Sequence, residues 1–364
     1  MILFVSGEYP PDVGGVGDYT AHLRTGLANL GWPSRVLTRK QVGRWDARSL
    51  LWLVRTAPRG GIVHIQFQAG AYDLLGDVCL MPALVRVFRA RTRVVTTFHD
   101  TREPYLFPRA GRRLRQQAVR LLARTSHAVI AADQRDLVEI GGPSPRHHRV
   151  PIGSNIACAP PPGFDRQAYR SRLGLGPNTL AVAYFGLLNA SKGLDLLLDA
   201  FELLLDRRPD TRLLLLGGGV GASDPTDRAT ADRLRSRLER LRAHVIATGW
   251  LAAPDLSAHL LSGDIAAFPY VDGASPRRGS LLACAEHGLP IVSTLPAAPE
   301  VEPFIEAVAP DPTALTAAVL RIDADPGLAA RRRETSRAFA AQVTWPSIAA
   351  AHVRIYQRLL YSRT

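Results

Sequence analysis

One lysine is the first candidate for chemistry, because the chain contains almost none. Of its 45 basic residues only Lys40 and Lys192 are lysines, and the others are arginines. Lys192 lies in the segment Phe185–Gly193 (FGLLNASKG), between a predicted strand and a predicted helix. An ammonium group beside a helix N-terminus provides two sources of positive charge, which together suit a diphosphate. The alternative is a lysine that is simply solvated at the surface.

A second cationic segment follows another predicted strand. The segment Pro269–Leu282 (PYVDGASPRRGSLL) contains Arg277 and Arg278, followed by Gly279 and Ser280 at the start of a predicted helix. Two guanidinium groups, a serine hydroxyl and the free N–H groups of a helix N-terminus form a plausible cradle for phosphate.

The third segment, Pro10–Tyr19 (PPDVGGVGDY), lies between the first predicted strand and its helix. Gly15 and Gly17 would let the backbone approach a ligand closely, and a helix N-terminus favours an anion. The segment lacks the G-x-G-x-x-G fingerprint of dinucleotide-binding domains. We therefore expect an anion or sugar site here, with a flexible turn as the alternative.

Two histidines lie in or after predicted strands. His99 directly follows the strand Arg93–Phe98, where a ligand contact is possible, although a histidine in such a place is often a satisfied core residue. His64 lies inside the apolar strand Ile62–Gln66, and we expect it to be buried structure.

Strands and helices alternate along the chain, which predicts an α/β fold with doubly wound parallel sheets. The predicted strands are Ile2–Ser6, Ser34–Leu37, Ile62–Gln66, Arg93–Phe98, Ala128–Ala131, His148–Pro151, Leu180–Gly186, Arg212–Gly217, Val245–Thr248, Ile265–Phe268 and Pro290–Ser293. The predicted helices are Asp18–Leu30, Gly193–Asp206, Ala229–Ala243, Asp255–Ser262, Gly279–His287 and Trp345–Leu360.

The alternation breaks once, at Ala159–Gly163 (APPPG), whose composition predicts a linker, and then restarts. This predicts two Rossmann-like domains, 1–160 and 161–344, that face a central cleft. Residues 345–364 would form a closing helix that packs back toward the N-terminal domain.

Composition excludes several classes of protein. The 364 residues are 46% hydrophobic and 21% charged, unlike disordered or fibrous chains. Three widely spaced cysteines predict neither a disulfide framework nor a zinc site. No signal peptide and no membrane-spanning run is recognisable, so we expect a cytoplasmic protein.

The net charge of +13 is concentrated in the first half of the chain, with +10 in residues 1–165 and +3 in the remainder. The stretch Arg109–Arg124 contributes six arginines, no acidic residue and an apolar side. Interfacial helices that bind anionic lipid have this composition, which predicts a peripheral contact with the inner face of a membrane. The alternative is a solvated helix face.

Taken in order, these segments resemble those of the retaining family 4 glycosyltransferases, which have the GT-B fold. The resemblance covers nearly the whole chain. It rests on YPPDVGGVGDY, VHIQF, TFHD, VPIGSN, FGLLNASKG, HGLPIVST and the closing helix. It implies a metal-independent, hexosyltransferase-like enzyme that moves a sugar from a nucleotide-sugar donor, UDP- or GDP-linked, to an acceptor hydroxyl with retention of configuration. No other cofactor is implied.

The resemblance also implies roles for individual residues. His99 would contact the donor sugar and Lys192 the diphosphate, and these two are the predicted catalytic residues. The predicted donor-binding residues are Gly15, Gly17, Gly186, Lys192, Arg277, Arg278, Gly279, Ser280 and Leu281.

The chain departs from the family at three positions. Leu187 stands where the family usually has an arginine, and Ser275 and Ala283 stand where it usually has two glutamates. The S-x-R-R-G-S form of the loop resembles that of a distinct branch, in which Arg277 and Arg278 would recast the site.

These departures leave a second interpretation open, a catalytically silent GT-B protein that binds sugar or acts as a scaffold. The acceptor could be a glycan, a lipid-linked sugar or a small molecule. Nucleic-acid binding is not expected, because no recognition motif is present.

Overall fold

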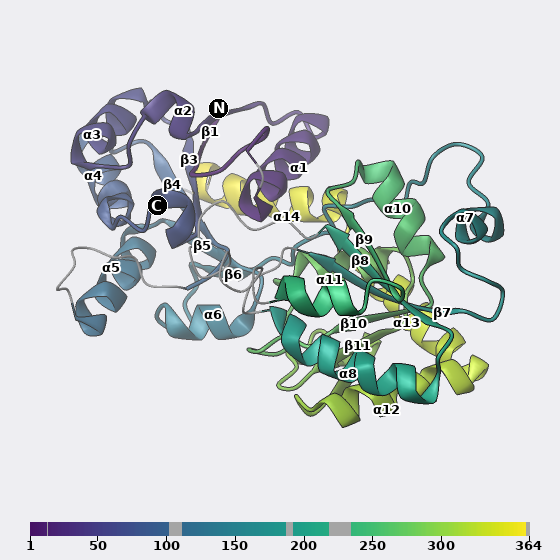
Figure 1. Ribbon diagram of the computed structural model, residues 1–364. Coiled ribbons are helices and arrows are strands. Elements are labelled where there is room, and N and C mark those ends of the chain that lie inside the picture. Colours follow the sequence, from purple (N-terminus) through teal and green to yellow (C-terminus); the bar gives the residue numbers. More distant parts are fainter. Residues whose placement is uncertain (13, 102–110, 187–191, 218–233, 362–364) are drawn as a thin grey trace. The chain divides into compact units, whose positions relative to one another are not determined.

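The computed structural model describes every residue except 13, 102–110, 187–191, 218–233 and 362–364. The chain divides into two compact units, shown in Figure 1. Unit 1 consists of Met1–Gly153 with the returning segment Thr344–Thr364, and unit 2 consists of Ser154–Val343. Within the described part of the chain, no helix has both the length and the apolar character needed to span a bilayer.

Unit 1 is built on a six-stranded parallel sheet in the order β2-β1-β3-β4-β5-β6. Its strands β1 and β3 are buried along their whole length, as expected for a parallel sheet with both faces covered. The strands are β1 (Ile2–Ser6), β2 (Ser34–Leu37), β3 (Ile62–Phe67), β4 (Arg93–Phe98), β5 (Ala128–Ala131) and β6 (His147–Arg149). The helices are α1 (Gly15–Asn29), α2 (Arg39–Val42), α3 (Ala47–Thr56), α4 (Met81–Phe88), α5 (Arg112–Thr125), α6 (Gln134–Glu139) and α14 (Trp345–Tyr361), with 3-10 turns η1 (Ala69–Tyr72) and η2 (Asp77–Leu80).

The last helix, α14, packs against α1 and the sheet of unit 1. Ile348, Ala349 and Tyr356 share one buried apolar cluster with Leu23 and Leu27 of α1. A buried polar contact fixes the helix further, since the Tyr356 hydroxyl lies 2.7 Å from Nδ1 of His64 in β3.

Unit 2 repeats the architecture with the order β12-β11-β10-β7-β8-β9, again all parallel. The predicted α/β class and its doubly wound parallel sheets are therefore confirmed. The strands are β7 (Leu180–Gly186), β8 (Thr211–Gly217), β9 (Val245–Gly249), β10 (Ile265–Phe268), β11 (Ile291–Thr294) and β12 (Ile305–Val308). The helices are α7 (Arg166–Arg172), α8 (Leu194–Arg207), α10 (Ala253–Ser262), α11 (Gly279–Glu286), α12 (Pro312–Ala324) and α13 (Pro326–Gln342), with the 3-10 turn η4 (Glu302–Phe304).

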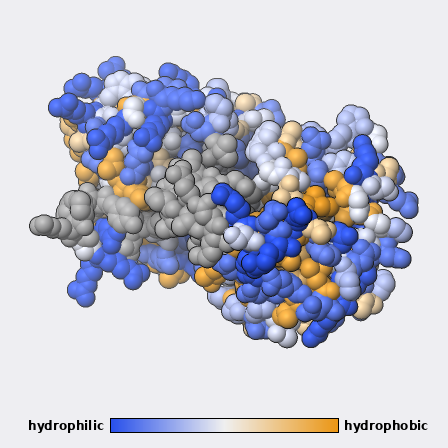
Figure 2. Space-filling view, viewed as in Figure 1, coloured by the Kyte–Doolittle hydropathy of each residue, from blue (hydrophilic) through white to orange (hydrophobic). Residues whose placement is uncertain are grey.

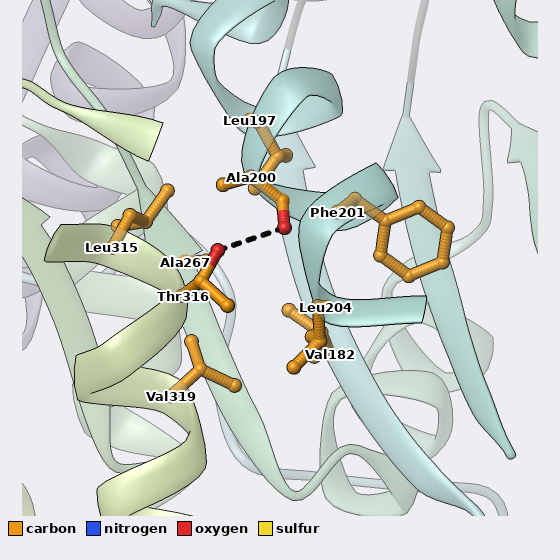
Figure 3. A pocket seen from close by; sticks show the side chains of 9 residues that line it. All are labelled: Val182, Leu197, Ala200, Phe201, Leu204, Ala267, Leu315, Thr316 and Val319. Atoms are coloured by element: carbon orange, nitrogen blue, oxygen red, sulfur yellow. Dashed lines mark hydrogen bonds between the residues drawn. The ribbon is translucent and has the colours of Figure 1, made fainter. Parts of the chain in front are cut away.

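A small cavity between α8 and α12 belongs to the core of unit 2 (Figure 3). Thr316 closes one side by donating a hydrogen bond of 2.9 Å to the carbonyl oxygen of Ala200. The cavity has a volume of about 10 Å³, which is room for one water molecule at most. It is therefore a packing gap that is too small for an organic ligand.

Several predicted boundaries need correction. The first helix begins at Gly15 and not at Asp18, so Gly15 and Gly17 form its first turn. The strand predicted at His148–Pro151 lies at His147–Arg149, and β12 was not predicted. Of the helix predicted at Ala229–Ala243, residues 234–240 are helical, and its first five residues lie outside the described part.

The docking of α14 predicts a specific loss of stability. Tyr356→Phe removes the hydroxyl that pairs with buried His64, which should lower the free energy of unfolding by about 1–3 kcal/mol. Urea or thermal unfolding measures the change. Tyr361→Phe is the matched control, because Tyr361 is exposed at the end of the same helix and should leave stability unchanged. Equal stability of both variants would contradict the role given to the Tyr356 hydroxyl.

Candidate functional site

The strand order of unit 2 reverses between β7 and β10, which are neighbours in the sheet. The chain leaves β7 toward α8, and it leaves β10 toward α11. In open α/β sheets, ligands bind at the carboxyl ends of the strands at such a reversal. The two predicted cationic segments follow these two strands, so the topology brings them to one place.

Three side chains meet there. The Lys192 ammonium donates a hydrogen bond of 3.2 Å to the hydroxyl of Ser280, in the first turn of α11. The same Ser280 hydroxyl shares a hydrogen bond of 2.9 Å with the Tyr270 hydroxyl. Lys192 also lies 5.3 Å from the centre of the Tyr270 ring, a cation–π distance. The lysine is therefore held by two side chains of the Pro269–Leu282 segment, Tyr270 and Ser280.

Arg278 adds a second cation on the same aromatic ring. Its guanidinium carbon lies 4.6 Å from the centre of the Tyr270 ring, and its Nη2 forms a close ion pair with Asp272. Arg277 is half-buried in the same loop. Arg278 is also the residue immediately before α11, so its charge lies beside the positive end of that helix.

Two glycines allow the segment that contains Lys192 to lie close to the segment that contains Tyr270 and Ser280. Gly193 has a φ of +66°, and a Cβ there would lie 1.8 Å from the carbonyl oxygen of Pro269. Only glycine can therefore bring the residue after Lys192 against the residue before Tyr270. Gly186, at φ +143°, would place a Cβ 3.7 Å from the Lys192 ammonium and 3.8 Å from the Ser280 hydroxyl, so its missing side chain leaves space beside both groups.

The electrostatics of this cluster suit an anion. Burial, assisted by the nearby Arg278 charge, lowers the pKa of Lys192 from its usual value to about 7. Burial also raises the pKa of Tyr270, so its phenol is neutral at physiological pH. Arg278 is paired with Asp272, whereas the desolvated Lys192 ammonium has no carboxylate partner among the described residues, and a bound diphosphate would supply a negative charge beside it.

The remaining predicted residues of unit 2 lie on or beside α11. Gly279 is its first residue. The Leu281 side chain is fully buried, so only its backbone could reach a ligand. Ser275 and Ala283, at the positions of the missing glutamates, are both buried, and the Ser275 hydroxyl has no hydrogen-bond partner among the residues that the structure describes. Leu187 lies outside the described residues.

The predicted residues of unit 1 lie in the first turn of α1 and directly after β4. Gly15 and Gly17 belong to the first turn of α1, and Tyr19 of that helix packs edge-on against the His99 ring with centroids 4.7 Å apart. The His99 Nε2–H donates a hydrogen bond of 2.8 Å to Oε1 of Gln66, near the end of β3.

The chemistry open to His99 is limited by its environment. Burial and the nearby His352 lower the pKa of His99 to about 3, so the imidazole is neutral at physiological pH. With Nε2 committed to Gln66, Nδ1 is left as a hydrogen-bond acceptor. The buried amide nitrogen of Gln66 has no hydrogen-bond partner within the described residues, which leaves its N–H donors unsatisfied there.

His64 is the buried structural residue that the sequence suggests. It is fully enclosed, with Nδ1 at 2.7 Å from the Tyr356 hydroxyl and Nε2 at 2.7 Å from the Thr97 hydroxyl. Its pKa is lowered by burial, so it is held neutral inside the unit.

Two residues of these clusters were not predicted as site residues, Tyr270 and Gln66. A signal for Gln66 was present, because it and His64 are the two polar residues of the buried strand β3. Among the described residues, no His, Cys, Asp and Glu side chains are grouped so that three could hold a metal ion.

Comparison with known proteins gives a consistent result for unit 2. Residues 179–325, which span most of this unit, match the family model described as "Glycosyl transferases group 1". A D-inositol 3-phosphate glycosyltransferase from Kineococcus radiotolerans is 28% identical over 316 residues, covering 71% of this chain and 68% of that enzyme. A GDP-mannose-dependent alpha-(1-6)-phosphatidylinositol monomannoside mannosyltransferase from Mycolicibacterium smegmatis is 33% identical over 128 residues, covering 35% of this chain and 31% of that enzyme.

Solved structures share the fold over almost the full length. HepE from Anabaena, in complex with UDP and glucose, superposes with a TM-score of 0.73 at 19% identity, covering 97% of this chain and 98% of HepE. Sucrose-phosphate synthase from Thermosynechococcus elongatus gives a TM-score of 0.74 at 18% identity, covering 100% of this chain and 99% of the synthase. Residues 179–325 are therefore similar to glycosyltransferases of group 1, and the chain shares the GT-B type of fold with the solved structures.

Proposed function

We propose that this protein transfers a sugar from a nucleotide-diphosphate sugar to an acceptor hydroxyl, with retention of anomeric configuration and without a metal ion. The observation that carries the proposal is the convergence of Lys192, Ser280 and Arg278 on Tyr270 at the strand reversal of unit 2. A site with two cations and a helix N-terminus suits the diphosphate of such a donor.

The proposed chemistry depends on charge that develops as the donor breaks. When the bond from the sugar to the diphosphate is cleaved, negative charge grows on the leaving phosphate. Lys192, Arg278 and the first N–H groups of α11, at Gly279, Ser280 and Leu281, would stabilise it without needing a metal. Their positions are fixed before the reaction, so little reorganisation is needed.

The donor nucleotide is proposed as UDP or GDP. Support for UDP comes from the complex of HepE with UDP and glucose, and support for GDP from the GDP-mannose-dependent relative. In unit 1, the neutral His99 and the unpaired amide of Gln66 offer an acceptor and a donor to a hydroxyl-rich ligand. We propose that they contact a sugar or the acceptor through its hydroxyl groups.

A second candidate function is a catalytically silent protein that binds a nucleotide sugar. It is favoured by the enclosed Ser275 and Ala283 at the positions where the family usually has glutamates. Both candidates share the diphosphate site, so they differ in transfer and not in donor binding.

Replacing Lys192 tests the role of its charge. Lys192→Ala should lower turnover about 10²–10³-fold, because one charged donor to the leaving group is lost. Steady-state transfer with the best donor measures this. Lys40→Ala, which removes the other lysine, an exposed residue of unit 1, is the control and should keep most of the activity. Unchanged turnover in Lys192→Ala would refute the assignment.

Donor affinity should depend on pH in a defined direction. The pKa of Lys192 is about 7 in the protein. Its side chain is therefore a charged ammonium below this pH and a neutral amine above it. The groups that face it are Arg278 and the phenol of Tyr270, whose raised pKa keeps it neutral. The dissociation constant of UDP-glucose or GDP-mannose should therefore rise about tenfold from about pH 6 to about pH 8. Calorimetry measures it.

The control for this pH effect is Lys192→Arg. A guanidinium stays protonated throughout this range, so the variant should show an almost flat profile. A wild-type profile that is equally flat would contradict the assignment of the titration to Lys192.

A panel of donors separates the two candidate functions. We expect one UDP- or GDP-sugar to raise the melting temperature and to be consumed in the presence of an acceptor mixture. Binding that Lys192→Ala weakens, with no hydrolysis or transfer of any sugar, would favour the silent protein. If no nucleotide sugar binds, both candidates fail.

A further inference from the structure

Three helices of unit 1 together carry eight arginines and no acidic residue. These are α3, α4 and α5. α4 packs against both of the others, and Figure 1 shows the three at one end of unit 1. We call their exposed side chains the basic face. The sequence pointed to Arg109–Arg124 alone; of that stretch the structure describes residues 111–124, and Arg109 lies outside the described part.

The basic face also exposes large apolar side chains that a soluble surface usually hides. Val87 and Phe88 at the end of α4 are 72% and 58% exposed, and Trp52 of α3 is 43% exposed. Figure 2 shows hydrophobic side chains among hydrophilic ones over this end of unit 1. The other exposed apolar residues of these helices are Leu51, Leu114 and Leu121.

The helix α5 shows how charge and apolar surface are combined. Val119, Leu122 and Ala123 are buried against unit 1. Leu114 and Leu121 of the same helix are exposed. Arg113 directly precedes Leu114, and Arg120 directly precedes Leu121. Both arginines are exposed as well. The outer face of α5 is thus both cationic and apolar.

We propose that the basic face docks unit 1 on an anionic lipid bilayer. The arginines would lie at the level of the negative headgroups, and Trp52, Val87 and Phe88 would enter the boundary with the acyl chains. A second copy of the same face is a poor partner, because eight arginines would meet eight others. A nucleic acid would neutralise the charge but leave the exposed aliphatic side chains without an apolar partner.

This inference does not depend on the proposed glycosyl transfer. It concerns where unit 1 binds, and it is tested with neither donor nor acceptor present. A failure of membrane binding and a failure of catalysis are therefore distinguishable.

Vesicle co-sedimentation of the full chain tests the proposal. The vesicles are phosphatidylcholine alone or phosphatidylcholine mixed with phosphatidylglycerol. We expect binding to the mixed vesicles in low salt, with little binding to phosphatidylcholine alone. The affinity should fall strongly at about 1 M NaCl, where the Debye length is about 3 Å. Equal binding to both vesicle types, no binding at all, or preference for a competing duplex RNA would overturn the proposal.

Two matched double variants locate the binding surface. Arg113→Glu with Arg120→Glu should weaken binding to the mixed vesicles by at least about tenfold, since each arginine near an anionic surface contributes substantially. Arg207→Glu with Arg240→Glu makes the same change of net charge at exposed positions of unit 2 and should bind as the unaltered protein does. An equal loss in both variants would show a general charge effect and overturn the proposal.

Tryptophan fluorescence tests insertion of the apolar side chains. Emission should shift to shorter wavelength on adding the mixed vesicles, because Trp52 leaves water. Trp52→Phe should lose most of this shift, and Trp250→Phe, which removes an exposed tryptophan of unit 2, should keep it. A shift that survives in Trp52→Phe, or that disappears in Trp250→Phe, would contradict docking through the basic face.

Discussion

The desolvated Lys192 ammonium is the constraint around which the site of unit 2 is built. Burying a cation costs free energy unless hydrogen bonds and opposite charge compensate. Within the protein, compensation comes from the Ser280 hydroxyl and the Tyr270 ring, and Arg278 adds charge of the same sign. Such an arrangement is stable enough to fold and becomes better satisfied when a diphosphate arrives. The strand reversal between β7 and β10 is what allows one lysine to reach two elements that are about 80 residues away in sequence.

Unit 1 contains buried histidines that are uncharged, in contrast to the cations of unit 2. Its buried histidines are kept neutral, and each is paired through a neutral side chain: His64 with Tyr356 and Thr97, and His99 with Gln66. The pairing of His64 ties the last helix of the chain to the sheet, so residues from both ends of the sequence build one core. The unit therefore presents hydrogen-bonding groups and not cations at His99, which suits hydroxyl groups better than phosphates.

The basic residues are distributed differently in the two units. The excess in residues 1–165 arises partly from the arginines of α3, α4 and α5, on the outer surface of unit 1. The cationic cluster of unit 2 consists of Lys192 and Arg278, in a half of the chain that is nearly balanced overall. The net charge of the chain therefore locates neither the cationic cluster of unit 2 nor the basic face of unit 1. Two partly buried cations form the first, and many exposed arginines form the second.

The sequence by itself determined most strands, the segments that follow them and the choice of Lys192. Buried parallel strands are continuous apolar runs, and one of only two lysines is easily seen among 43 arginines. The sequence placed Ile2–Ser6, Arg93–Phe98, Leu180–Gly186 and Ile265–Phe268 at the bounds that the structure gives. It did not reveal that Gly15 and Gly17 are helical, since glycine is compatible with either state. Only the tertiary structure decided that Tyr270 holds Lys192, that Gln66 fixes His99 and that Phe88 is exposed. The first two are contacts between residues far apart in sequence, and the exposure of Phe88 depends on how its helix packs. All three depend on the tertiary arrangement of the elements, which local patterns do not encode.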